Sequence, residues 1–146
     1  MAELHVRAAR PWDAGALAAL LTEVARPARR MTGAEVRAWM ATPGTLWHLA
    51  EGGDPGDAPL ALQWGEPAAD LPETCDLCTF ARPGPRRIPA GSAVVEATRR
   101  AARAAGLRYL RAAPQGGNEA AIAFYRSRGF ETVGMAGNRV VMLRGA

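Results

Sequence analysis

The sequence predicts a mixed α/β domain: a mainly antiparallel central sheet of about seven strands, with helices on both faces and one parallel βαβ unit. Three observations predict this fold class. Short apolar or alternating runs, bounded by glycine and proline, recur along the chain as strands do. Longer segments carry apolar residues at helical spacing. One such helix, over residues 90–105, lies between two strand-like runs, so those two strands should be parallel.

The first third of the chain predicts one strand and two helices. Residues 3–9 alternate and predict a strand with Leu4 and Val6 on one face. Asp13 is placed to cap a helix that Pro27 ends, and Thr32 begins a second helix through a capping box with Glu35. The residues expected to face the core are Leu17, Leu20, Leu21 and Val24 in the first helix, and Val36, Trp39 and Met40 in the second.

Three strands are expected in the middle of the chain. Residues 45–50 and 59–64 predict a hairpin joined by the turn-rich segment 52–57. A third strand, near 74–80, leads into a loop rich in proline and glycine. The helix over 90–105 follows, ended by Gly106. Its core face is expected to consist of Val94, Thr98, Ala101 and Ala105.

The last third adds a strand, a helix and a hairpin. Asn118 is placed to cap the helix and Gly129 to end it, with Phe130 making the accompanying apolar contact. These elements are expected over residues 107–112, 119–128, 131–135 and 139–144. The full order is strand, helix, helix, three strands, helix, strand, helix and two strands.

Length and composition limit the class of protein. With 146 residues, 49 % of them apolar, the chain fits one globular domain over 1–146. No apolar run approaches the ~20 residues of a membrane span, and residues 1–13 contain no apolar signal core, so a cytoplasmic protein without a membrane partner is expected. The net charge is +4, but all 18 basic residues are arginine in a chain rich in Ala, Gly and Pro. This pattern indicates compositional bias, and no nucleic-acid partner is expected.

Cys75 and Cys78 form a Cys-x-x-Cys pattern, which can indicate a redox pair or a zinc site. Their neighbours predict a strand, on which residues three apart point to opposite faces. A structural zinc needs four ligands, and only His5 and His48 remain as further soft partners. Buried cysteines and no metal are therefore expected.

The segment from Arg86 to Ser92 joins a strand to a helix and has features of an anion site. A helix N-terminus presents unpaired N–H groups and a partial positive charge. Ala90 and Gly91 allow close approach to the backbone, and Arg86 and Arg87 can pair with phosphate oxygens. By itself this pattern is more often only a turn.

Two spaced patterns in the second half are more specific. Residues 86–91 read Arg-x-x-Pro-x-Gly, and residues 118–130 read Asn-x-x-Ala-x-x-Phe-Tyr-x-x-x-Gly-Phe. The region 74–141 therefore resembles the conserved half of the GCN5-related N-acetyltransferases (GNAT family), whose acyl-CoA motif runs Arg/Gln-x-x-Gly-x-Gly/Ala. The second pattern matches that family in full, whereas Pro89 replaces the usual glycine of the first. The N-terminal half agrees only in its order of elements.

The resemblance implies an acyl-CoA N-acyltransferase fold and an enzyme, with acetyl-CoA as co-substrate. It implies transfer of the acetyl group to an amine of a small molecule or protein by direct attack in a ternary complex, by a monomer or homodimer. Tyr125 corresponds to the general acid, and the strand over 77–80 should splay from the strand over 107–112 to admit the pantetheine arm. The cofactor-binding residues implied are Cys78, Thr79, Phe80, Arg86, Arg87, Ile88, Ala90, Gly91, Ser92, Asn118, Ala121 and Phe124.

No general base is evident in the sequence. Glu73 and Asp76 are the nearest candidates, but their parity places at most one of them toward the cleft. Glu51 and Glu66 could act through a water molecule. His48 is expected to be structural.

Two further features leave the interpretation open. Pro89 lacks an N–H and removes one phosphate donor, although proline fits the first turn of a helix. A non-catalytic acyl-CoA-binding or regulatory relative is therefore the alternative. The tryptophans Trp39, Trp47 and Trp64 could line an acceptor pocket or equally belong to the core.

Overall fold

A computed structural model describes residues 4–25, 30–52 and 57–146. The strands form one seven-stranded sheet in the order β1-β2-β3-β4-β5-β7-β6. The strands are β1 (Leu4–Ala8), β2 (Leu46–Gly52), β3 (Ala61–Pro67), β4 (Thr74–Ala81), β5 (Tyr109–Ala112), β6 (Glu131–Ala136) and β7 (Arg139–Gly145). The helices are α1 (Ala14–Val24), α2 (Gly33–Met40), α3 (Arg87–Ala104) and α4 (Glu119–Ser127), with a 3₁₀ turn at Pro11–Asp13. The predicted order of elements is confirmed.

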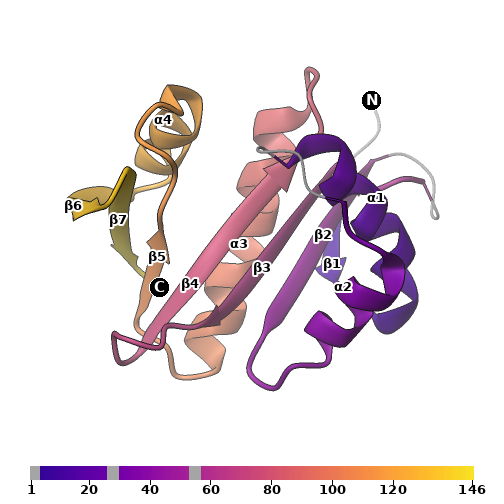
Figure 1. The fold of residues 1–146 in the computed structure, drawn as a ribbon, viewed down its shortest axis with the longest axis horizontal. Coiled ribbons are helices and arrows are strands. Elements are labelled where there is room, and N and C mark those ends of the chain that lie inside the picture. Colours follow the sequence, from indigo (N-terminus) through magenta and orange to yellow (C-terminus); the bar gives the residue numbers. More distant parts are fainter. Residues whose placement is uncertain (1–3, 26–29, 53–56) are drawn as a thin grey trace.

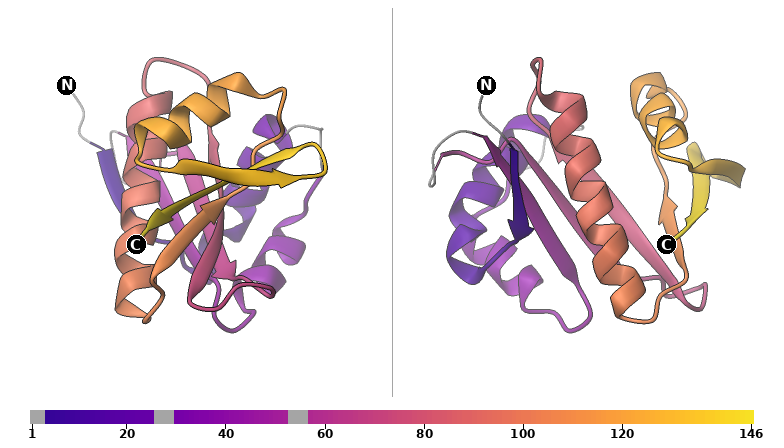
Figure 2. Two further views of the ribbon diagram at one scale, coloured as in Figure 1. Left: turned by 90° about the vertical axis from the view of Figure 1, so that its left-hand side faces the viewer. Right: turned by 180° about the vertical axis from the view of Figure 1, so that it is seen from behind.

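All neighbouring strands are antiparallel except β4 and β5, which run parallel on either side of α3. The expected βαβ unit and the mixed α/β class are therefore confirmed. Helices α1 and α2 cover one face of the sheet and α3 covers the other (Figures 1 and 2). Among the described residues, no helix is both long and apolar enough to cross a membrane.

Most predicted helix ends are confirmed by their capping contacts. The hydroxyl of Thr32 accepts from the Glu35 N–H at 3.1 Å, and the Glu35 carboxylate accepts from the Thr32 N–H at 3.2 Å. The side chain of Asn118 accepts from the Ala121 N–H at 3.1 Å. Gly106 and Gly129 end their helices with φ of 86° and 90°, values that favour glycine.

The prediction that Asp13 caps α1 was wrong. Asp13 lies within the preceding 3₁₀ turn, and its carboxylate points back, where it accepts from the Arg10 N–H at 2.7 Å. Arg7 also donates to both of its oxygens at 2.8 Å, and these bonds lower the pKa of the carboxyl group. Pro27, expected to end α1, lies outside the described residues, as do residues 53–56 of the predicted turn.

The predicted core face of α3 was correct at its start and wrong at its end. The helix begins at Arg87, so Pro89 lies in its first turn. Its buried residues are Ala90, Gly91, Val94, Val95, Thr98 and Ala102. The buried face continues from Thr98 to Ala102, four residues on, so the predicted Ala101 is only half-buried. Ala105 lies beyond the end of the helix and is exposed.

The core has two main parts, one on each side of the sheet. The α1–α2 side buries the predicted leucines of α1 together with Val36, and the half-buried Val24, Trp39 and Met40 pack against them. Three tryptophans and Phe80 form a continuous aromatic group here, with Trp64 stacked on Phe80 at 5.1 Å between ring centroids. The α3 side buries Leu77, Tyr125 and Phe130.

His48 predicts a pH dependence of stability. It is buried under α3, its Nδ1 lies 3.0 Å from the Thr98 hydroxyl, and burial lowers its pKa. The unfolded chain therefore binds a proton near pH 6.5 that the folded chain resists. We expect the free energy of unfolding to fall as the pH drops from about 7 to about 5, and His48→Gln to remove this slope. Urea unfolding at several pH values measures it; an unchanged slope in the variant would show that other groups cause it.

Candidate active site

The parallel strands β4 and β5 separate partway along their length. They pair only at Thr74, Cys75 and Asp76, opposite Tyr109, Leu110 and Arg111. Strand β4 continues to Ala81, whereas β5 ends at Ala112 (Figure 1). Residues 77–81 therefore have no strand partner on their β5 side. The splay expected over 77–80 is present, and it opens the sheet from one face to the other.

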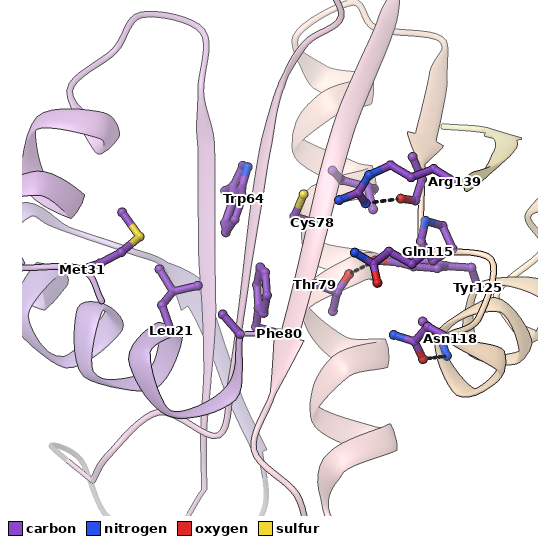
Figure 3. Close-up of a pocket in the computed structure, with 15 residues that line it drawn as sticks. Leu21, Met31, Trp64, Cys78, Thr79, Phe80, Gln115, Asn118, Tyr125 and Arg139 are labelled. Atoms are coloured by element: carbon purple, nitrogen blue, oxygen red, sulfur yellow. Dashed lines mark hydrogen bonds between the residues drawn. The ribbon is translucent and has the colours of Figure 1, made fainter. Parts of the chain in front are cut away.

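A cleft of about 570 Å³ lies over this opening. Its walls differ in chemistry (Figure 3). Leu21, Met31, Trp64 and Phe80 form an apolar wall on the N-terminal side, and Gln115, Asn118, Tyr125 and Arg139 form a polar wall on the C-terminal side. The cleft thus offers an apolar surface facing hydrogen-bonding groups, with β4 between them.

A second cavity of about 500 Å³, here called the groove, lies between the start of α3 and α4. It is lined by Thr79, Ala81, Arg87, Ile88, Gly91, Ala120, Ala121, Ala123, Phe124, Tyr125 and Ser127. Gly91 keeps it open, because a Cβ there would stand 3.3 Å from the Phe124 ring. The cleft and the groove share Thr79, Ala121 and Tyr125. A ligand extending through the splay would pass beside these three residues.

Tyr125 lies where the two cavities meet. The Tyr125 hydroxyl donates to Thr79 Oγ1 at 2.9 Å (Figure 3). The Thr79 hydroxyl donates in turn to Gln63 Oε1 at 2.6 Å. Burial raises the pKa of Tyr125 to about 12, and the bond to Thr79 only partly opposes this. The phenol therefore stays protonated across the physiological range and can serve as a hydrogen-bond donor.

Most residues implied as cofactor-binding lie at these cavities. Thr79, Arg87, Ile88, Gly91, Ala121 and Phe124 line the groove, and Cys78, Phe80 and Asn118 line the cleft. Ala90 is instead fully buried against Ala50 and Ala61, and Ser92 lines neither cavity. Arg86 lies against Gly52, where a Cβ would collide with its guanidinium. Ala90 packs against the sheet and Arg86 lies at the end of β2, so neither side chain lines the opening.

The carboxylates considered as general bases lie elsewhere. Glu73 pairs with Arg108 at 3.2 Å, and Asp76 pairs with Arg111 at 2.6 Å within the paired part of β4. Glu51 pairs with Arg7 at 2.9 Å, and Glu66 is exposed at the end of β3. None of these residues lines the cleft, and neither does His48. Among its described lining residues, the cleft contains no Asp, Glu or His.

Both cysteines were expected to be buried, which is correct for Cys75, whereas Cys78 is half-buried. Cys75 is buried on the α3 side, and Cys78 lies opposite Trp64 on the other face and lines the cleft. Both are free thiols, and burial raises their pKa values to about 12 and about 11. Within the described ranges, no group of His, Cys, Asp and Glu could hold a metal ion.

Three polar residues near the site were not predicted. Gln63 is the one polar residue in the predicted strand over 59–64, and that signal could have identified it. Gln115 and Arg139 reach the cleft from the β5–α4 loop and from β7. Arg139 donates to the carbonyl of Ala113 at 2.7 Å. Gln115 and Arg139 are brought together by a bridge between the β5–α4 loop and β7, a long-range pairing that the local sequence does not reveal.

Known proteins resemble this chain in fold rather than in sequence. No family model matches the chain, and no curated protein matches it. An N-acetyltransferase from Staphylococcus aureus Mu50 is similar with a TM-score of 0.79, 18 % identity, and coverage of 99 % of this chain and 98 % of that one. A GCN5-related N-acetyltransferase from Kribbella flavida has a TM-score of 0.79, 19 % identity and 98 % coverage of each chain. A GNAT-superfamily phosphinothricin acetyltransferase from Sinorhizobium meliloti, solved in complex with AcCoA, has a TM-score of 0.80, 19 % identity, and coverage of 97 % and 88 %.

These similarities extend over nearly the whole chain, including its N-terminal half. The chain therefore has the acyl-CoA N-acyltransferase fold of the GCN5-related N-acetyltransferases. The resemblance predicted from residues 74–141 is confirmed at the level of the fold.

Proposed function

We propose that this protein is an acetyl-CoA-dependent N-acetyltransferase that transfers the acetyl group directly to an amine in a ternary complex. The observation that carries this proposal is the meeting of two cavities at Tyr125, beside a splayed β4. The groove meets the start of helix α3, which suits a phosphorylated carrier. The other cavity faces the same point from the opposite side, as a second substrate requires.

The groove suits acetyl-CoA. In the first turn of helix α3 the Arg87 N–H donates to the Gly84 carbonyl and the Ala90 N–H donates to the Arg86 carbonyl, so the Ile88 N–H is the backbone donor left for an anion, and Arg87 adds a cation. Pro89 has no N–H to offer there, and its ring fits the first turn without disturbing the helix. Ile88 is 64 % exposed at the groove and provides an apolar surface for the adenine ring. Further in, Gly91 and Ala121 leave a narrow channel for the pantetheine arm.

The transfer needs a donor for the leaving sulfur. The amine nitrogen attacks the thioester carbon and forms the C–N bond while the carbonyl π electrons move to oxygen. The C=O bond then re-forms, the C–S bond breaks, and the electron pair leaves on sulfur. Tyr125 donates its hydroxyl hydrogen to that sulfur, and the proton released by the nitrogen passes to water or back to the tyrosine oxygen. A β4 N–H left without a strand partner can hold the developing oxyanion.

The acidities of the two partners are compatible. A thiol near 8.5 and a tyrosine near 12 would share a proton poorly, but both values depend on burial. Cys78 lines the same cleft, and burial raises its pKa to about 11. A CoA thiolate released in the same cleft is also desolvated, and desolvation raises the pKa of its thiol in the direction of the Tyr125 value.

The cleft also restricts the acceptor. An amine attacks only when neutral, and the described lining residues include no carboxylate or imidazole to deprotonate it. At pH 7.5 roughly a third of α-amines are neutral, against roughly one in a thousand lysine side chains. The apolar wall of Leu21, Met31, Trp64 and Phe80 favours an apolar body. The acceptor proposed is therefore a weakly basic amine carrying an apolar group.

Two assays test the function. Acetyl-CoA should raise the Tm, because a ligand that binds only the folded state stabilises it. Thiol release should then be fastest with phenylalaninamide, slower with glycinamide, which lacks the apolar group, and slowest with Nα-acetyl-lysinamide. A Tm increase without thiol release from any amine would indicate the non-catalytic acyl-CoA-binding alternative. No Tm increase at millimolar acetyl-CoA would contradict both.

The pH dependence provides a further prediction. We expect kcat/KM to rise with pH while the acceptor amine loses its proton and then to level off. Because Tyr125 stays protonated until about pH 12, it should cause no loss of activity up to about pH 11. A descending limb near pH 10, the value of an exposed tyrosine, would contradict the role given to this buried phenol.

A further inference from the structure

A row of polar side chains runs under α3 and ends at Tyr125. His48, Gln63 and Thr79 stand directly opposite one another on β2, β3 and β4, so all three point to the same face of the sheet. Gln63 is fully buried between its two neighbours. Its Oε1 accepts from Thr79, whereas its Nε2 is buried and has no hydrogen-bond partner among the described residues. A buried amide with one unused end is costly and calls for an explanation.

The hydrogen bonds in this row have a direction. With Oε1 toward β4, Thr79 donates to Gln63 and Tyr125 donates to Thr79. The hydroxyl hydrogen of Tyr125 then lies in the bond to Thr79, so only the lone pairs of the tyrosine oxygen face the cleft. Turning the amide by half a revolution places Nε2 where Oε1 was, because the two ends have the same shape. Gln63 then donates to Thr79, Thr79 donates to Tyr125, and the hydrogen of Tyr125 is released.

We propose that Gln63 is a positioning residue that sets the direction of this chain and so decides whether Tyr125 can donate to the leaving sulfur. This inference rests on the proposed acetyl transfer. Each orientation leaves one amide atom unpartnered, so neither is locked by its own hydrogen bonds. A thiolate beside Tyr125 favours the released orientation, because only that orientation gives the thiolate a donor. No covalent bond in the row changes except when Tyr125 passes its hydrogen to sulfur.

Gln63→Glu and Gln63→Met separate direction from packing. An introduced carboxylate can only accept, so it holds the Thr79 hydrogen and, through it, that of Tyr125. We expect kcat to fall by at least about tenfold, and by no more than the roughly 10²- to 10³-fold expected when the Tyr125 donor is lost altogether. The KM for acetyl-CoA should stay within about twofold. When protonated, the introduced carboxyl can donate, so the ratio of variant to wild-type kcat should rise as the pH falls. Gln63→Met has a similar volume and no hydrogen bonds, and its ratio should not depend on pH.

Other titratable groups surround Gln63 and could affect the pH dependence of kcat. His48 lies on β2, Tyr125 comes from α4, and Cys75 lies on β4 near Gly65. Helix α3 presents Val94, Val95 and Thr98 to this face. Because these groups are present in both variants, only the introduced carboxyl group distinguishes them. A pH-independent ratio for Gln63→Glu, or an equal loss in Gln63→Met, would overturn the proposal.

A measurement on the wild-type protein covers the case in which Gln63→Glu fails to fold. The side-chain NH₂ signals of Gln63 can be assigned by NMR from their disappearance in Gln63→Met. Saturating CoA at a pH that ionises its thiol should move one of these hydrogens downfield as it begins to donate to Thr79. Unchanged NH₂ signals in the CoA complex would contradict the proposed rotation of the Gln63 amide. If wild-type protein turns over no amine, the proposed function fails as well, whereas normal turnover with pH-independent variants removes only the role of Gln63.

Discussion

Replacing Tyr125 with phenylalanine is expected to lower kcat for acetyl transfer by about 10²- to 10³-fold while changing the Kd for acetyl-CoA by less than about threefold. The hydroxyl hydrogen-bonds to Thr79, and the ring packs against Phe124 and Phe130. The variant therefore removes the hydrogen donor and keeps the ring. Pre-steady-state thiol release, together with a calorimetric Kd, separates the chemical step from binding.

Tyr109→Phe is the matched control for this variant. Tyr109 is the other tyrosine of the chain, is 44 % exposed on β5, and lines neither cavity. It should keep wild-type kcat. An undiminished kcat in Tyr125→Phe would show that sulfur leaves without help from the phenol. A large loss of acetyl-CoA affinity would show that the hydroxyl acts mainly in binding.

Gly91→Leu should abolish measurable acetyl-CoA binding, with a Kd at least about 100-fold weaker than that of the wild type. Gly91 is buried on α3, and a Cβ there would already lie 3.3 Å from the Phe124 ring. A leucine side chain must then either displace Phe124 or occupy the groove between α3 and α4. Both outcomes close the path toward Tyr125. Titration of acetyl-CoA followed by Tm or calorimetry measures the loss.

Two variants control for the effect of the added side chain itself. Gly91→Ala adds only the Cβ, which needs a shift of a few tenths of an ångström, and should weaken binding much less than leucine does. Gly15→Leu places the same side chain on α1, where a Cβ meets nothing within 4 Å, and should bind acetyl-CoA normally. Wild-type affinity in a folded Gly91→Leu protein would mean that acetyl-CoA does not pass between α3 and α4.

The elements set by local contacts could be predicted from the sequence. The ends of α4 depend on Asn118 and Gly129, whose effects reach only a few residues, and both were placed correctly. The parallel pairing around α3 also followed from the order of elements. Asp13 was misplaced because the 3₁₀ turn and the partner Arg7 on β1 determine its direction, and neither is visible in the helix pattern.

The site was predictable only where a continuous motif builds it. Phe124 and Tyr125 lie three and four residues after Ala121 on α4, so helical spacing places all three on the same side of the helix. The bond from Tyr125 to Thr79 joins residues 46 positions apart, and Gln63 joins the row only through the register of β3 with β4. The carboxylates proposed as bases were chosen by nearness to β4 in sequence. The structure instead pairs Glu73 and Asp76 with arginines away from the cleft.

The central claim is that a thioester lies beside Tyr125, reached through the groove between α3 and α4. A crystal structure of the protein with CoA tests it most directly. We expect the pyrophosphate at the first turn of α3, the pantetheine arm in the gap beside residues 77–81, and the sulfur within hydrogen-bond distance of Tyr125 Oη. A sulfur atom lying outside the gap, with Tyr125 still bonded only to Thr79 and the cleft separated from the cofactor, would contradict the account.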